Sequence, residues 1–155
     1  MTKKILVVML IIMTSGFSVK AQNTVKDPES IIKEFFQLYK NKSTDSALEY
    51  IFSTNPWMSG SKDQTDALGL KLKNLISVIG DFHGEKLITK ASIASDIVMY
   101  SYLIKYDRQP LRFIMTFYKP NDSWRLYNFK FDDSLDDELD EAIKAHRLPE
   151  NTSGK

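Results

Sequence analysis

The sequence predicts an α+β protein in which N-terminal helices pack on a four-stranded antiparallel sheet and a short C-terminal helix follows. Apolar side chains recur at helical spacing as far as Ile79. After Gly80 the pattern changes to short segments rich in β-branched and aromatic residues, which is typical of strands. An acidic segment with helical spacing follows Ser134. Helices first and strands second favour a sheet covered by helices over an alternating α/β fold.

The composition is that of an ordinary globular domain. The chain has 155 residues, of which 43% are hydrophobic and 26% are charged, so one domain with its own core is expected. Its 21 Lys and Arg nearly balance its 20 Asp and Glu, and we therefore expect no nucleic-acid partner. Cysteine is absent, which excludes disulfides, thiol catalysis and cysteine-based metal sites.

The first 21 residues have the layout of a secretory signal peptide. A basic start at Lys3 and Lys4 precedes nine apolar residues at 5–13, and small residues follow up to Ala21. A membrane span needs about 20 apolar residues, so we expect no stable anchor after cleavage. A lipoprotein signal is excluded because no cysteine follows. Cleavage between Ala21 and Gln22 resembles the signal peptides of Bacteroidota-type bacteria, which implies Sec-type export to the periplasm or the exterior.

Three helices are expected in the first half of the exported chain. Asp27 before Pro28 is a strong helix start, because the acid caps free amides and proline fits the first turn. Ser43 or Thr44 caps a second, short helix that Asn55-Pro56 stops. A loop at 57–61 then leads to a third helix from about residue 63 to residue 79.

Four strands and a last helix are expected after Gly80. The strand candidates are residues 87–93, 97–106, 111–119 and 124–131, and turn-forming residues at 107–110 and 120–123 join the last three. The last helix runs from about Leu135 to Ala145, and its acidic front complements the helix dipole rather than binding a cation. We therefore expect a single domain at 22–148 and a loose tail at 149–155.

Tight hairpins without bulges would sort the strand side chains onto two faces of the sheet. This register places Tyr106 opposite Leu111 and Lys119 opposite Trp124. The heavier apolar face should receive the helices. The second face is still apolar, whereas a sheet face in water normally alternates more cleanly. It should therefore be covered by the C-terminal helix or by a partner, and we expect a second copy of the chain. The homodimer interface would be a row of large side chains: Leu103, Ile114, Tyr127 and Phe129.

Polar groups on the helix-facing side predict a ligand site. Tyr102, Met115 and Asn128 fall in one cross-strand row, and Lys130 falls in the next. One interpretation is a cavity under the helices where these groups converge. The other is that Asn128 satisfies a local backbone group and Lys130 reaches water. His83, at the entrance to the first strand, is either a further ligand residue or an edge histidine beside a glycine turn.

The element order and the last strand together resemble a known family. Helices followed by an antiparallel sheet that ends in Asp122-Ser-Trp-Arg-Leu-Tyr-Asn-Phe129 resemble the nuclear transport factor two-like superfamily over residues 28–133. The segment from Gly80 to Ile88 is similar to the first strand of secreted bacterial members. The resemblance implies a cone-shaped fold with a curved sheet. It also implies either enzymes, such as ketosteroid isomerase, dehydratases and epoxide hydrolases, or proteins that only bind ligands or dimerise.

Three functions fit these observations. The favoured one is a non-enzymatic, exported protein that binds a small apolar or amphipathic ligand or a protein partner. A small hydrolase, isomerase or dehydratase would need an acid/base pair inside the cone, whereas Asp96 and Asp107 fall at turns. A purely structural dimerisation module would fill the cone with its own side chains, and members of the resembled superfamily often dimerise through their sheets. His83 and His146 are far apart, so we expect no metal and no cofactor.

The export prediction can be tested on the protein recovered from cells. We expect a mature N-terminus at Gln22 in material from the periplasm or the medium, because the small residues ending at Ala21 suit a signal peptidase. Sequencing of the N-terminus checks this. An intact Met1 on a soluble cytoplasmic product would contradict it.

Overall fold

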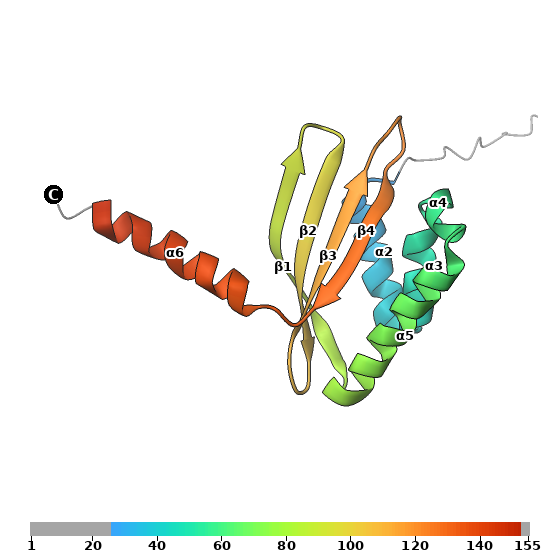
Figure 1. Cartoon of the computed structure of the whole chain (residues 1–155), viewed down its shortest axis with the longest axis horizontal. Coiled ribbons are helices and arrows are strands. Elements are labelled where there is room, and N and C mark those ends of the chain that lie inside the picture. The colour runs from blue at the N-terminus through green and yellow to red at the C-terminus, as the bar shows by residue number, and fades with distance from the viewer. Residues whose placement is uncertain (1–25, 153–155) are drawn as a thin grey trace, which may run out of the picture.

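Within residues 26–152, four helices precede a four-stranded antiparallel sheet and one helix follows it (Figure 1), which confirms the predicted α+β order. The computed structural model describes residues 26–152, so the predicted signal peptide and its cleavage site at Ala21 and Gln22 lie outside the described residues. The helices are α2 (Pro28–Asn41), α3 (Thr44–Ser53), α4 (Pro56–Ser59), α5 (Lys62–Ile79) and α6 (Asp136–Thr152). The strands are β1 (Phe82–Ile93), β2 (Ile97–Tyr106), β3 (Leu111–Tyr118) and β4 (Arg125–Asp132).

Three boundaries differ from the prediction. A helical turn, α4, replaces the expected loop after Pro56, because the Asn55 side chain accepts a hydrogen bond from the Trp57 amide at 3.1 Å. β1 begins at Phe82, since this end of the strand pairs with the end of β2. The last helix continues to Thr152, so the backbone of 149–152, expected to be loose, is helical.

Side-chain caps explain where the first helices start. The Asp27 carboxylate accepts a hydrogen bond from the Ser30 amide at 2.7 Å, and Pro28 occupies the first turn of α2. The Ser43 hydroxyl accepts a hydrogen bond from the Ser46 amide at 3.0 Å at the start of α3. Both caps satisfy backbone amides that have no partner inside the helix.

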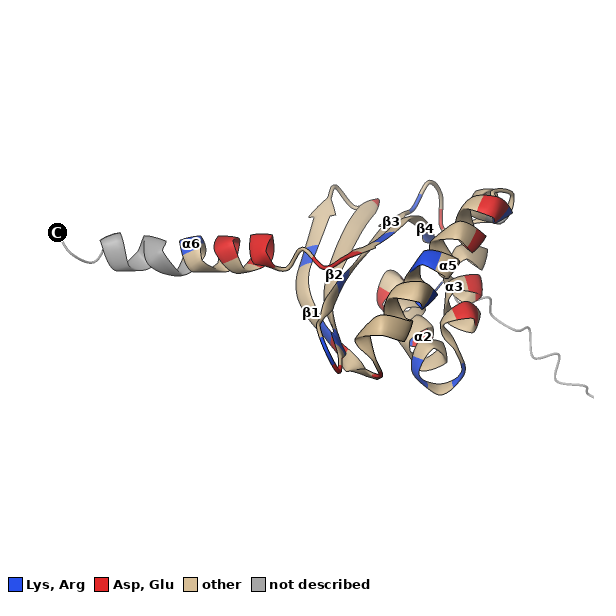
Figure 2. Ribbon diagram, turned by 60° about the horizontal axis from the view of Figure 1, so that its bottom comes forward, with Lys and Arg blue, Asp and Glu red and all other residues tan. Residues whose placement is uncertain are grey.

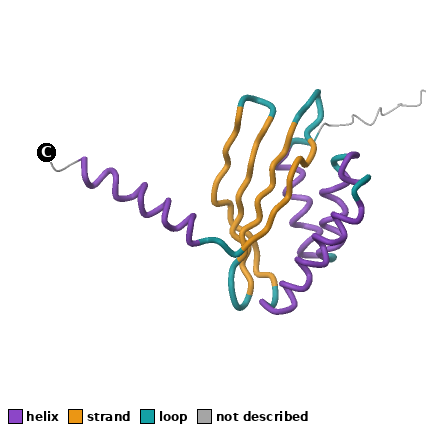
Figure 3. Tube along the Cα trace, in the orientation of Figure 1, coloured by secondary structure: helices purple, strands orange, loops and turns teal. Residues whose placement is uncertain are grey.

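Helices α2, α3 and α5 cover one face of the curved sheet (Figures 1 and 3), and the core lies between the two layers. Phe35 of α2 is completely buried, and its ring centroid lies 6.4 Å from that of Phe113 and 5.9 Å from that of Phe129. Met115 is also completely buried among these side chains. It therefore packs in the core instead of lining the cavity that the sequence suggested.

Two buried tyrosines link this helix layer to the sheet. The hydroxyls of Tyr39 on α2 and Tyr106 on β2 lie 2.5 Å apart and form a hydrogen bond. Burial raises the pKa of both hydroxyls, so both remain neutral at physiological pH. The pair satisfies two polar groups inside an otherwise apolar interior.

The β2–β3 hairpin keeps the predicted faces but not the predicted register. Leu111 lies opposite Ile104 rather than Tyr106, which is a shift of two residues. Side chains alternate with a period of two, so this shift leaves every side chain on its predicted face. The longer turn explains the shift, because Tyr106 remains in β2 but has no partner in β3.

A bulge in β4 overturns the predicted faces of the last strand. Leu126 pairs with Phe117 and Asn128 pairs with Thr116, so Tyr127 is an additional residue between two regular pairs. The extra residue reverses the face of each side chain that follows. Phe129, predicted at an outer dimer interface, is 5% exposed and lies in the core. Lys130, predicted under the helices with Asn128, lies with it on the opposite face.

The sheet face opposite the helices is uncovered by any other element of residues 26–152 (Figure 2). Leu103, Ile114 and Tyr127 lie on this face, as predicted. Helix α6 does not cover it but projects away from the end of the sheet (Figures 1 and 2). No helix among the described residues has the length and apolar character needed to cross a membrane.

The bulge can be tested by comparing two aromatic residues on either side of Asn128. Phe129→Ala should lower the free energy of unfolding by about 3–5 kcal/mol, because it leaves a cavity among buried rings. Tyr127→Ala should change it by about 0.5 kcal/mol or less, because that side chain is 65% exposed. Urea denaturation of both variants measures the difference. A bulge-free strand would place both residues on the outer face, so equal effects would contradict the bulge.

Candidate functional site

A groove of about 630 Å³ lies beside β4, between this edge strand and the α4–α5 region. The buried rings of Phe52 and Phe129 form its floor, and Met58 and Leu68 contribute apolar wall. Trp57 lies at its rim and is 78% exposed, which is unusual for so large an apolar side chain. The groove is therefore concave and mostly apolar, as small-molecule sites usually are.

The connection between α3 and α4 holds the helical wall of the groove against β4. The Asn55 side chain donates a hydrogen bond to the Leu126 carbonyl at 2.7 Å. The Thr54 hydroxyl accepts one from the Leu126 amide at 3.1 Å. These two side chains take the place of a neighbouring strand at Leu126, and so they cover part of the exposed edge of the sheet. The same Asn55 caps α4 and thereby places Trp57 at the rim.

The bulge shapes the strand wall of the groove. Arg125, Tyr127 and Asn128 come from the bulged part of β4, and Tyr118 comes from the end of β3. A bulge redirects the side chains that follow it, and here it places Asn128 on the same side of β4 as Arg125 and Tyr127. The only formal charge among the side chains lining the groove belongs to Arg125.

The Arg125 guanidinium makes no hydrogen bond or ion pair with another described residue. A guanidinium offers five donors in a planar fork that suits a carboxylate or another oxyanion. Asn128 and Gln64 add neutral polar groups nearby. The described residues that line the groove include no Asp, Glu, His or Lys, and its ionisable side chains other than Arg125 are Tyr118 and Tyr127.

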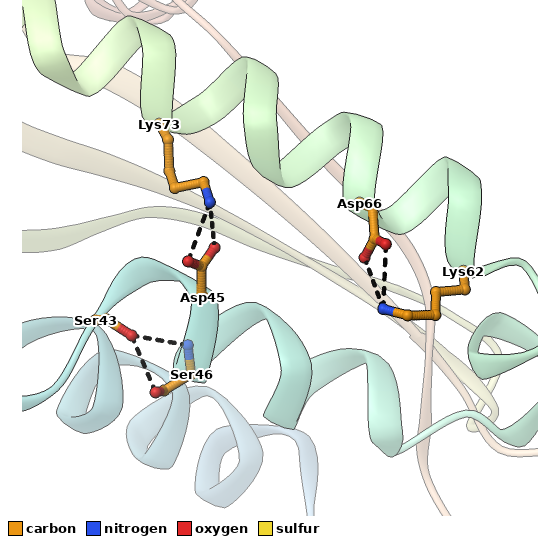
Figure 4. Close-up of polar contacts among 6 residues, drawn as sticks. All are labelled: Ser43, Asp45, Ser46, Lys62, Asp66 and Lys73. Atoms are coloured by element: carbon orange, nitrogen blue, oxygen red, sulfur yellow. Dashed lines mark hydrogen bonds and ion pairs between the residues drawn. The ribbon is translucent and has the colours of Figure 1, made fainter.

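A second groove, of about 680 Å³ between α3 and α5, has a different character. Lys73 on α5 binds Asp45 on α3 at 3.0 Å, and Lys62 binds Asp66 one turn further along α5 at 3.1 Å (Figure 4). Both lysines are thus already paired within the protein. The first pair joins α5 to α3, and the second lies within α5. Arg125, in contrast, has no such partner among the described residues and can receive a ligand.

The predicted ligand residues do not come together. Tyr102 lies on the helix-covered face, where its ring centroid is 5.1 Å from that of Phe36. Asn128 lines the groove, and Lys130 is exposed on the open face beyond it. Met115 is completely buried in the core. Their predicted convergence on one cavity is wrong, because the bulge turns the two β4 residues to the other side.

His83 is placed separately, near the start of β1. Its Nε2 lies 2.6 Å from a carboxylate oxygen of Asp107, whose second oxygen accepts a hydrogen bond from the Asp81 amide at 2.6 Å. Gly80 approaches the same carboxylate with φ of 95°, and a Cβ there would lie only 2.4 Å from it. These contacts join two turns of the fold, so Asp107 shapes a loop, as the sequence predicted.

The interior offers no alternative site of acid/base chemistry in the described part of the chain. The buried polar residues among 26–152 are Asn55 at the edge of the sheet and Ser101 on its open face, together with hydroxyls of buried tyrosines such as the Tyr39–Tyr106 pair. Among residues 26–152, no three His, Asp or Glu side chains lie close enough together to hold a metal ion.

Comparison of the chain with protein-family models, with curated proteins and with solved structures finds no match. The resemblance to the nuclear transport factor two-like superfamily therefore stays a prediction.

The groove is not among the predicted sites. A tryptophan directly after Asn55-Pro56 is the one signal that the sequence offers for it, because large apolar side chains outside the core often mark binding surfaces. The position of Arg125 in the same groove as Trp57 and Leu68 has no sequence signal, since it depends on the packing of α5 beside β4.

The Asp107 contacts predict a dependence of stability on pH. The Asp81 amide, and then His83, hold the pKa of the Asp107 carboxyl below its usual value. A carboxyl with a lowered folded pKa stabilises the fold above its unfolded pKa of about 4, and this contribution is lost as pH falls through the folded value. Asp107→Asn should therefore be less stable than the native protein at pH 7, and the difference should shrink at pH 3.

Urea denaturation at the two pH values measures this difference. Asp122→Asn, in the exposed β3–β4 turn, is the matched control and should change little at either pH. A deficit of Asp107→Asn that is undiminished at pH 3 would show that the carboxylate charge is not responsible.

Proposed function

We propose that this chain is an exported, non-enzymatic protein that binds a small amphipathic anion in the groove beside β4. The apolar part of the ligand lies on Phe52, Leu68 and Phe129, and its anionic group meets Arg125. The observation that carries this proposal is a guanidinium at the rim of a mostly apolar groove that has no ion-pair partner among residues 26–152. Such a cation, next to an apolar floor, suits a ligand with one charged end.

The lining supports binding rather than catalysis. Its ionisable side chains are Arg125 and two tyrosines, and none of these is an ordinary proton acceptor at neutral pH. A hydrolase, isomerase or dehydratase inside the cone would need an acid/base pair there, whereas Phe35, Leu72 and Phe113 are completely buried in that interior. The packed interior also agrees with a structural module, but a structural module does not account for the groove.

The element order supports two further parts of the proposal. Helices on a curved antiparallel sheet are what the resemblance to the nuclear transport factor two-like superfamily implies, and non-enzymatic binding is one role found there. Export rests on the basic start and apolar run of the first 21 residues.

Calorimetric titration with decanoate and with decylammonium tests the charge preference. Decanoate should bind at least about tenfold more tightly, because a charge-assisted contact with Arg125 contributes about 1.5–3 kcal/mol. Arg125→Gln should weaken decanoate binding about tenfold and remove the preference.

Lys130→Gln is the matched control, because it also removes one positive charge from β4. Lys130 lies further along the strand than Arg125 and does not line the groove. It should leave the decanoate dissociation constant within about twofold. Equal binding of both probes, or equal loss in both variants, would contradict a role for Arg125. Absence of binding by either probe would overturn the groove as an amphiphile site.

A further inference from the structure

The open face of the sheet, defined here as the outward side chains of β1–β4, is apolar at its centre and basic around it. Leu103 and Ile114 lie partly buried on the two central strands. The outward positions carry five basic residues but one acid: Lys86, Lys105, Arg112, Arg125 and Lys130, against Asp132. Asp132 is bound by Arg112 through both carboxylate oxygens, at 3.0 and 3.1 Å. The charges that remain on this face, once Asp132 is paired with Arg112, are therefore positive.

Helix α6 has the complementary character. Leu135, Leu139, Ala142 and Ile143 lie within about 100° of one another around the helix and form an apolar stripe. Leu139 is 59% exposed and Ile143 is 47% exposed. At 100° per residue, Asp136 and Glu138 flank the stripe on either side, and the other acids lie behind them. The one basic residue in 135–145, Lys144, already pairs with Glu141 at 2.7 Å.

Contacts at its base direct α6 away from its own sheet. Three residues separate β4 from α6, and the Ser134 amide donates a hydrogen bond to Asp132 at 3.1 Å. Arg112 holds Glu138 in the first turn at 3.1 Å while it also holds Asp132. Folding back onto its own sheet would require α6 to reverse its direction within those three residues. Helix α6 instead projects away from the sheet (Figures 1 and 2), and Leu139 and Ile143 of its stripe are exposed.

We propose that two copies of this chain exchange their C-terminal helices, so that α6 of each lies across the open sheet face of the other. The stripe packs on Leu103 and Ile114, and the flanking Asp136 faces the basic rim. The 17 residues of α6 extend about 25 Å, while three spacings of about 4.8 Å separate the outer strands, so the helix is long enough to cross the sheet. A two-fold axis gives each copy the same contact twice, which doubles the apolar area buried.

The absence of cysteine makes the exchange directly testable, because introduced thiols are unique. Leu139→Cys protein is mixed with Thr116→Cys protein, and a bis-maleimide linker is added. Thr116 lies on the open face, opposite Met99 of β2 and two residues along β3 from Ile114. Exchange predicts a cross-linked pair in the mixture. Self-linking of Thr116→Cys chains alone would indicate that the sheets pack on each other, and would overturn the exchange. A Leu139→Cys, Thr116→Cys double variant that links only within one chain would overturn it as well.

Light scattering after size exclusion provides the second measurement. Leu139→Lys should raise the dimer dissociation constant at least about tenfold, because it puts a charge in the centre of the contact. Asp137→Lys places the same side chain on the far side of α6 and should stay within about twofold of the native protein. A native protein that is monomeric at 100 µM would overturn the proposal.

Discussion

One additional residue in β4 determines what the two sides of this sheet present. The bulge at Tyr127 sends Phe129 into the core, where its ring contacts those of Phe35 and Phe113. It also turns Lys130 and Asn128 outward. Without the bulge, two polar groups would enter an apolar interior and a large ring would face water, and both changes are unfavourable. The packing of the helix layer, the wall of the groove and the charge of the open face all depend on this local feature.

Side-chain contacts where chain turns meet position the elements around the core. The Thr54 and Asn55 side chains satisfy both backbone groups of Leu126, and so they join the helix layer to the edge of the sheet. At another turn, Asp107 joins the start of β1 to the β2–β3 turn. Such contacts contribute modestly one by one, but each replaces water at a backbone group and thereby positions a whole element. The groove exists because the first of these contacts holds α4 beside β4.

Charge pairing separates structural groups from candidate functional ones. Lys62, Lys73 and Arg112 each have an acidic partner, and these pairs connect helices or anchor α6. Arg125 has none among the described residues and lies at the rim of an apolar groove. The apolar stripe of α6 and the open sheet face are likewise two surfaces that no other element of residues 26–152 covers. The proposed ligand and the proposed exchange each supply the missing complement for one of these surfaces.

The sequence by itself determined the order of the elements, the caps at Asp27 and Ser43, and the faces of β2 and β3, because these depend on local spacing and on a period of two. Even a hairpin register wrong by two residues kept those faces, since a shift of two restores the alternation. The tertiary structure alone decided the faces of β4 and the position of the site. A bulge has no reliable signature in an alternating strand, because its stability comes from rings that pack across the whole core. The groove likewise depends on contacts such as that of Asn55 with Leu126, which lie 71 residues apart in the chain.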